Sequence, residues 1–386
     1  TQTRAPTGAP DNGLYATHIQ IASTTLDNTA GTLSAAQNLT LTLSDTLTNT
    51  AGHLSAGATL DLTADHLSNH TGTLLSGASQ TLHLHRLTGD GRLHAGNALT
   101  LTLQDSLDTA GTLSATGLLT LTTAGDLTNR GLIQAADLTA QARDITTTAT
   151  GQLLTTGHTH LTATGTLNNS GHLQAADLTA QAHDITTTAT GQLLTTGHTH
   201  LTATGTLTNS GLLQAPDLTA QANTITNTAT GRLLTSGHAQ LTATDTLTNS
   251  GLAQAGDLTV HARDITNTAT GQLIANNLAQ LTATATLTNR GLIDAFTTHL
   301  SAATIDNLGT GRLYGDHIAL QAHTLTNRDE TSDGHTHTAT IAARQRLDIG
   351  ADTLRNTANA MILSDGDAAI GATLDNALHA TGIAAL

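Results

Sequence analysis

A glycine recurs about every twenty residues along most of the chain, and an aliphatic residue follows it two positions later in almost every unit. Gly151 with Leu153 and Gly171 with Leu173 are two successive examples. Self-similarity at a fixed period of this length indicates a solenoid, in which each repeat stacks on the one before it. The aliphatic positions are therefore predicted to form one ladder that points inward.

Between these glycines, apolar and polar residues alternate, as in residues 138–142 (LTAQA) and 161–164 (LTAT). Alternation with a period of two is typical of a half-buried β-strand. Many of the polar residues are threonine, whose β-branched side chain suits strands and loses rotamer freedom in a helix. We therefore predict an all-β fold in which each unit is one coil of a β-solenoid. Its inward layers should include Ile133, Leu138, Ala140, Ile145, Leu153, Leu161 and Leu167.

A second aliphatic ladder indicates that the true repeat is a forty-residue pair of coils. Leu127, Ile145, Leu167 and Ile185 are separated by 18, 22 and 18 residues, and the alternation continues to Ile305. The difference in length between the two coils lies just before the glycine, where LTNSG alternates with ITNTATG. Alternate coils should therefore have a turn two residues wider on one edge. Glycine at this point fits a corner that needs a positive φ angle.

Asparagine follows this second ladder two residues later in most coils, for example at Asn209, Asn227 and Asn249. Asparagine tolerates the left-handed conformation and hydrogen-bonds to backbone groups. Identical amide side chains stacked along an axis can also pair with one another. We predict a structural asparagine ladder here rather than a row of polar ligands.

The repeat is interrupted in two places. Residues 1–12 include Pro6 and Pro10 and have no periodic pattern, so we predict an irregular N-terminal tail or link. Repeats then occupy residues 13–327. Residues 328–338 (RDETSDGHTHT) are predicted to form a surface insertion loop, and residues 339–386 are predicted to form further coils.

A leucine-rich repeat is the alternative fold, because LTLSDTLTN (residues 41–49) has a similar spacing of leucine and asparagine. That repeat needs a helix or an extended turn on its outer side. Here the other half of each unit contains Thr, Gly and Ala in strand alternation, which favours the β-solenoid.

Near-exact duplication favours a scaffold. Residues 131–170 and 171–210 differ at only four of forty positions. A catalytic pocket brings unlike residues together once, so it has no use for a second copy of the same block.

Composition narrows the classes of partner. Aromatic residues make up 1% of the chain, so any core must consist of Leu, Ile and Ala in thin layers. The formal net charge is −15 and the 13 basic residues are dispersed arginines, so nucleic acid is not an expected partner. Without cysteine there is no disulfide framework, and no apolar run is long enough to insert into a membrane. The chain begins with Thr and has no signal segment, so we expect it to be a segment of a longer protein.

Histidine is frequent, with 21 residues. His158 and His160, repeated as His198 and His200, are at strand spacing with both side chains on one face, where two imidazoles could share a Zn²⁺ ion. A third ligand is not evident, and the matching pair lies two coils away. We therefore predict polar surface residues, with no metal and no cofactor.

A polysaccharide-active enzyme of the lyase or pectinase type is the alternative function, because β-helices also carry such chemistry. It needs a compact carboxylate cluster, or Ca²⁺ with a basic residue, together with aromatic platforms for sugar. The aspartates Asp137, Asp177, Asp217 and Asp257 are instead dispersed, one per pair of coils, as in a solvent-exposed ladder. We predict that the chain is not an enzyme and has no catalytic residue.

The insertion contains the one group of unlike polar residues. Loops displayed on a rigid scaffold are where binding tends to occur. The candidate partner contact consists of Tyr314, Asp329, Glu330, Asp333, His335 and His337.

These units resemble the filamentous haemagglutinin repeats of large exoproteins that Gram-negative bacteria secrete through two-partner systems. The resemblance rests on units such as residues 207–237 (LTNSGLLQAPDLTAQANTITNTATGRLLTSG), and residues 346–376 are similar to the segment that follows such arrays. It extends over nearly the whole chain from about Leu26. The fold that it implies is a right-handed parallel β-helix forming a filament that projects from the outer membrane.

The resemblance also implies function and partners. The chain would be a stalk segment of a secreted, cell-surface exoprotein. Its partners would be an outer-membrane transporter of the two-partner type, bound through regions absent from this sequence, and a receptor on a host cell or a bacterial surface. The family includes haemagglutinin-type adhesins and effectors of contact-dependent growth inhibition, and both share the repeats.

Overall fold

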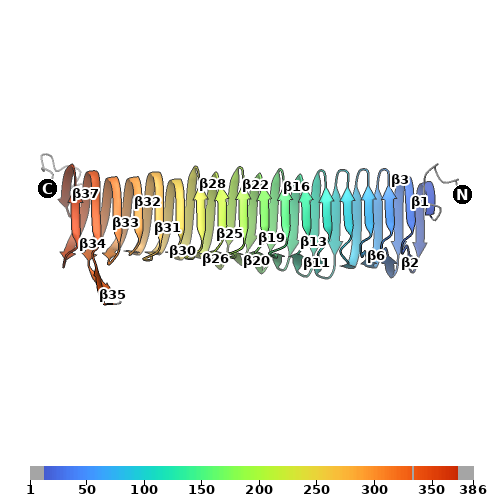
Figure 1. Ribbon diagram of the computed structural model, residues 1–386, viewed down its shortest axis with the longest axis horizontal. Coiled ribbons are helices and arrows are strands. Elements are labelled where there is room, and N and C mark those ends of the chain that lie inside the picture. The colour runs from blue at the N-terminus through green and yellow to red at the C-terminus, as the bar shows by residue number, and fades with distance from the viewer. Residues whose placement is uncertain (1–12, 333, 373–386) are drawn as a thin grey trace. The chain divides into compact units, whose positions relative to one another are not determined.

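The computed structural model describes residues 13–332 and 334–372, and these residues form strands and turns with no helix (Figure 1). None of them therefore forms a helix that could cross a bilayer. The chain divides into two compact units, which we describe separately. The first comprises Thr1–His183 and Gly191–Leu193, and the second comprises Asp184–Thr190 and Leu194–Leu386.

In the first unit the strands are β1 (Gly13–Ser23), β2 (Leu26–Asp27), β3 (Thr32–Leu43), β4 (Thr46–Thr48), β5 (His53–Ala56), β6 (Leu60–Ser68), β7 (Thr73–Ser76), β8 (Gln80–Thr88), β9 (Arg92–Ala95), β10 (Leu99–Leu103), β11 (Leu107–Thr109), β12 (Thr112–Ala115), β13 (Leu118–Thr123), β14 (Leu127–Asn129), β15 (Leu132–Ala135), β16 (Asp137–Ala142), β17 (Ile145–Thr147), β18 (Gln152–Thr155), β19 (His158–Ala163), β20 (Thr166–Asn169), β21 (His172–Ala175) and β22 (Asp177–Ala182).

In the second unit they are β23 (Asp184–Thr187), β25 (His198–Ala203), β26 (Thr206–Asn209), β27 (Leu212–Ala215), β28 (Asp217–Asn227), β29 (Arg232–Thr235), β30 (His238–Asn249), β31 (Leu252–Asn267), β32 (Gln272–Asn289), β33 (Leu292–Leu308), β34 (Arg312–Arg328), β35 (Glu330–Ser332), β36 (His335–His337), β37 (Thr340–Thr357), β38 (Met361–Ser364) and β39 (Asp367–Gly371). Strand β24 (Gln192–Thr195) includes residues of both units.

Each unit is a parallel β-solenoid, as predicted. A coil of the first unit contains three short strands, such as β15, β16 and β17, and each pairs in parallel with its equivalent one coil later, here β18, β19 and β20. In the second unit, long strands such as β31 and β32 bend around the corners and keep the same parallel pairing. The seven predicted inward residues from Ile133 to Leu167 are all at most 4% exposed. The core is therefore a set of aliphatic ladders enclosed by three strands per coil.

The register explains the alternating 18- and 22-residue intervals. Ile133 pairs with Leu153, Leu138 with Thr159 and Ile145 with Leu167. The offset thus grows from 20 to 21 to 22 residues around the coil, because the second coil of a pair has one extra residue at each of two corners. The first coil has the predicted wider turn at the third corner, closed by a hydrogen bond from the Gly151 amide to the Thr148 carbonyl.

The predicted positive φ angle at the repeating glycines is wrong. Among the described residues, positive φ occurs at Gly89, Gly309 and Gly334, which lie outside the twenty-residue series, and at the non-glycine residues Ala30, Ala51, Thr71 and Ala358. The series glycines are required by lack of space instead. A Cβ at Gly271, for example, would overlap the backbone oxygen of Asn249 and the side-chain oxygen of Asn267.

The predicted asparagine ladder is present and buried. In the second unit, Nδ2 of Asn227 donates to Oδ1 of Asn249 (2.8 Å), and the same bond recurs from each ladder asparagine to the next as far as Asn356. The Nδ2 atoms also reach backbone carbonyls near the glycine corner, as Asn267 does to Leu292 (3.1 Å). In the first unit Thr147 occupies one ladder position, and Asn129 donates to the Gln152 carbonyl alone. The ladder therefore adds a side-chain donor to backbone carbonyls at this corner, and some of these, such as Gly251, also accept a backbone amide.

Replacing Leu153 with Asp is expected to lower the local free energy of unfolding by several kcal/mol, because it buries an unpaired carboxylate between Ile133 and Leu173. The matched control is Gln152→Asp on the outward side of the same strand, with a cost under about 1 kcal/mol. Hydrogen exchange should lose protection in the coils next to Leu153 while distant coils keep it, because solenoid stability is close to a sum of neighbour terms. Equal effects of the two substitutions would contradict the assigned core.

Replacing the buried Asn267 with Leu is expected to cost about 2–3 kcal/mol, because it leaves the Asn289 Oδ1 and the Leu292 carbonyl without their donor. Asn267→Thr introduces the residue that the chain itself has at Thr147 and should cost less. Amide exchange in residues 251–290 measures both. If the leucine variant were as stable as the parent, the ladder would not contribute to stability.

Candidate functional site

The predicted insertion forms a β-hairpin at the end of β34. Strands β35 and β36 pair antiparallel, with Glu330 opposite His337 and Thr331 opposite Thr336. Figure 1 shows β35 projecting away from the coil to which it is attached. Because opposite residues share a face and alternate residues repeat it, His335 and His337 lie on the same face of the hairpin as Glu330.

Glu330 binds the hairpin back to the solenoid. Its carboxylate accepts two hydrogen bonds from Arg290, at 2.7 Å from Nε and 2.9 Å from Nη2. A second guanidinium, that of Arg328, lies 3.7 Å away. The hydrogen bonds from Arg290 outweigh burial and lower the pKa of Glu330 below its ordinary value. The ionised carboxylate is therefore part of the hairpin's attachment.

Asp329 is a second anchor, and it is only 8% exposed. Its Oδ2 accepts hydrogen bonds of 2.9 Å from the backbone amide and from the side chain of Asn359, in the turn of the following coil. Together Asp329 and Glu330 connect the base of the hairpin to coils on both sides of it.

The structure thus separates the six predicted contact residues. Asp329 and Glu330 turn back toward the solenoid, whereas His335 is exposed and His337 is half-buried in the projecting hairpin. Tyr314 lies near the start of β34, in register with Asp294 and Ala342, while the hairpin follows the end of that strand. Asp333 lies outside the described residues.

The histidine pairs lie on the outer surface of the strands. His158 and His160 share one face of β19, as predicted from their spacing. His158 Nδ1 is 3.3 Å from a carboxylate oxygen of Asp177, and His160 Nε2 is 3.1 Å from the hydroxyl of Thr162. Within residues 13–332 and 334–372, no three His, Asp or Glu side chains converge as metal ligands.

The dispersed aspartates have a structural role that sequence reasoning missed. Asp137, Asp217 and Asp257 each accept a hydrogen bond from a backbone amide of the next coil, those of His158, His238 and Leu278, at 2.7, 2.8 and 3.2 Å. These amides lie at the first of the two corners where the second coil has an extra residue. The detectable signal was an aspartate at the first position of a strand, with Gly157 or Gly237 at the matching corner one coil later.

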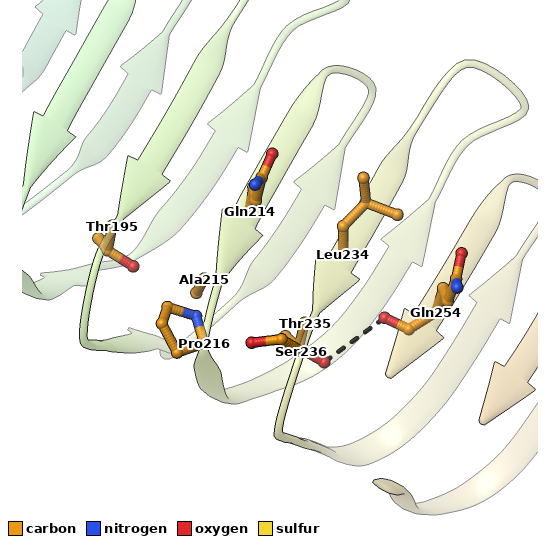
Figure 2. Close-up of a pocket in the computed structure, with 8 residues that line it drawn as sticks. All are labelled: Thr195, Gln214, Ala215, Pro216, Leu234, Thr235, Ser236 and Gln254. Carbon is orange, nitrogen blue, oxygen red and sulfur yellow. Dashed lines mark hydrogen bonds between the residues drawn. The ribbon is translucent and has the colours of Figure 1, made fainter. Parts of the chain in front are cut away.

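The surface of the second unit has an open groove of about 350 Å³ next to Pro216 (Figure 2). Its lining consists of Thr195, Gln214, Ala215, Pro216, Leu234, Thr235, Ser236 and Gln254. These side chains include hydroxyls, amides and aliphatic groups but no titratable group, so the groove has no acid–base pair for catalysis.

Comparison with known families gives six matches to the haemagglutinin repeat model. They cover residues 11–85, 75–131, 132–171, 172–211, 212–251 and 252–328. No curated protein and no solved structure matches the chain significantly. From residue 132 to residue 251, each matched segment is one forty-residue pair of coils, the repeat unit found above.

The attachment of the hairpin is expected to weaken in acid. A carboxyl whose pKa is lowered by folding contributes stability above its unfolded pKa of about 4.3, and loses it as the pH falls through the lower folded value. Hydrogen-exchange protection of residues 330–337 should therefore fall on acidification below about pH 4. Glu330→Gln should give reduced protection at neutral pH and remove this pH dependence, and an unchanged acid profile in that variant would contradict the assignment.

Proposed function

We propose a stalk function for this chain, which belongs to the haemagglutinin-repeat family, a family of structural segments in filamentous, secreted surface adhesins. In this function the coils give length and stiffness, and binding or toxic regions of the parent exoprotein are held away from the cell that secretes it. The observation that supports it most directly is that the same forty-residue block is repeated with the same buried ladders.

The contacts between coils support a mechanical role. Within each unit, the described coils are joined to their neighbours by parallel backbone hydrogen bonds, and in the second unit also by an asparagine bond at nearly every step. Bending such a solenoid would require many of these bonds to lengthen together. The titratable groups are spread along the solenoid, where they accept backbone amides at corners or form surface ion pairs. This distribution supports a scaffold more than a single catalytic site.

The finer proposal concerns location and partners. The parent exoprotein would be held at the outer membrane by a transporter of the two-partner type, and would contact a receptor on a host cell or on a neighbouring bacterium. Within this chain we assign the partner contact to the projecting hairpin, through the exposed His335 and the half-buried His337 on the face that they share with Glu330. Adhesion and contact-dependent inhibition both require such a stalk.

A lyase or pectinase function gains no support from the carboxylates. Asp137 and Asp257 accept backbone amides, Asp329 is held by Asn359, and Glu330 is held by Arg290. We therefore propose that the chain has no catalytic function.

Deletion of residues 131–170 tests the stalk function, because it joins Arg130 to Gly171 and so recreates the Arg130–Gly131 junction without changing the order of coil types. The shortened exoprotein is expected to fold, to keep the per-coil exchange protection of the parent and to bind target cells as before. The double variant His335→Ala, His337→Ala should fold equally well and lose cell binding. Loss of binding on deletion of the block, or polysaccharide turnover by the chain, would overturn the proposal.

A further inference from the structure

One face of the second unit differs from the other two. On the first strand of five successive coils, an outward position holds an aliphatic residue, namely Leu212, Leu234, Leu252, Ile274 and Leu292, and each is half-buried. We call this surface the aliphatic face. On the second and third strands of the same coils most outward residues are polar, as at Gln240, Thr248 and His261. Leu278 and Phe296 are the large apolar exceptions.

The aliphatic residues alternate with long polar residues in both directions. Along the solenoid axis Leu212 stacks on Arg232, Arg232 on Leu252, Leu252 on Gln272 and Gln272 on Leu292. Two residues further along each strand the order is reversed, with Gln214, Leu234, Gln254, Ile274 and Asp294. Figure 2 shows Gln214, Leu234 and Gln254 on three successive strands.

We propose that the aliphatic face binds the same face of a second copy of this chain, with the two solenoid axes antiparallel. The proposal goes beyond the stalk function, because it adds lateral association between stalks. The two copies are then related by a twofold axis that runs parallel to the strands through the coil of Leu252. This axis leaves each residue at the same position along its strand and reverses the order of the coils.

This symmetry brings like side chains together. Leu252 then faces Leu252 of the second copy, Leu212 faces Leu292, and Leu234 faces Ile274. With the two axes parallel, the row of residues that contains Leu252 would face the row that contains Gln254. Each aliphatic residue would then lie opposite a polar one.

The polar positions are compatible with the same twofold axis. Arg232 faces Gln272 of the second copy and Gln214 faces Asp294, so amides meet the charged groups and no like charges are opposed. Interfaces with C2 symmetry require this kind of self-complementary pattern.

The area of contact makes the association weak. A four-residue strand is about 13 Å long and five coils span about 24 Å, so the face covers roughly 300 Å² in projection, well below the ~800 Å² per partner of a standard stable complex. The dimer should therefore form only at high concentration in solution. Stalks that project toward each other from two facing surfaces would have antiparallel axes and would meet at such concentrations locally.

Sedimentation velocity of the full chain over a concentration series tests the proposal. A monomer–dimer equilibrium is expected as the concentration approaches the millimolar range, and the double variant Leu234→Lys, Ile274→Lys should remain monomeric throughout. The matched control Gln240→Lys, Gln280→Lys places the same two charges at half-buried outward positions of the same coils on the second strand, and should dimerise like the parent. Unchanged far-UV circular dichroism and melting temperatures establish that both variants are folded.

Spin labels test the antiparallel symmetry, since the chain has no native cysteine. The two labels at Gln254→Cys, one on each copy, lie opposite each other at the twofold axis. They are separated only by the gap of about 10 Å between packed sheets. Labels at Gln214→Cys are displaced by four coils, about 19 Å, along the axis. The inter-label distance should therefore be shorter for position 254 than for position 214.

Three results would overturn the proposal. The first is a chain that stays monomeric at every concentration, and the second is a dimer that persists in the Leu234→Lys, Ile274→Lys variant. The third is equal label distances at positions 214 and 254, which would indicate a parallel arrangement. None of these results would affect the stalk function, which depends on the fold of the single chain and on cell binding.

Discussion

In-register parallel pairing, in which each residue lies on its equivalent one coil earlier, is the constraint on which the rest of this structure depends. Leu153 lies between Ile133 and Leu173, and Asn267 lies between Asn249 and Asn289. A side chain that fits at one level therefore fits at the next. Aliphatic residues stacked in this way exclude water with few aromatic rings, which is how a chain with 1% aromatic residues can form a core.

The corners decide which residues such a stack tolerates. Strand pairing satisfies the backbone along each side, but at a corner the register shifts and some polar groups lose their partners. Three residue types meet this need. Aspartate accepts the amide of an extra residue, asparagine donates to backbone carbonyls and to the next asparagine, and glycine leaves room where a backbone oxygen of the preceding coil passes close by. Asp144, Asn249 and Gly271 are examples.

Function in such a molecule depends on what is left on the outer surface. The ladders use nearly all inward positions, so new binding properties arise from departures from the repeat. One departure is the hairpin held by Arg290 and Asn359, and another is the aliphatic face around Leu252. Both keep the register of the coils intact, because an insertion at a corner or a change of outward side chain leaves the inward stacking unchanged.

The sequence by itself determined the solenoid, its inward ladders, the forty-residue pairing of coils and the position of the insertion, because each is a periodic signal repeated many times along the chain. It did not determine the reason for the repeating glycines or the roles of Asp137 and Glu330. Those depend on the contacts of a residue with others about twenty to forty positions away, such as the Asp137 carboxylate with the His158 amide and Glu330 with Arg290. Only the tertiary structure brings these groups together, because a change of one residue in the register decides which atom of the neighbouring coil lies opposite.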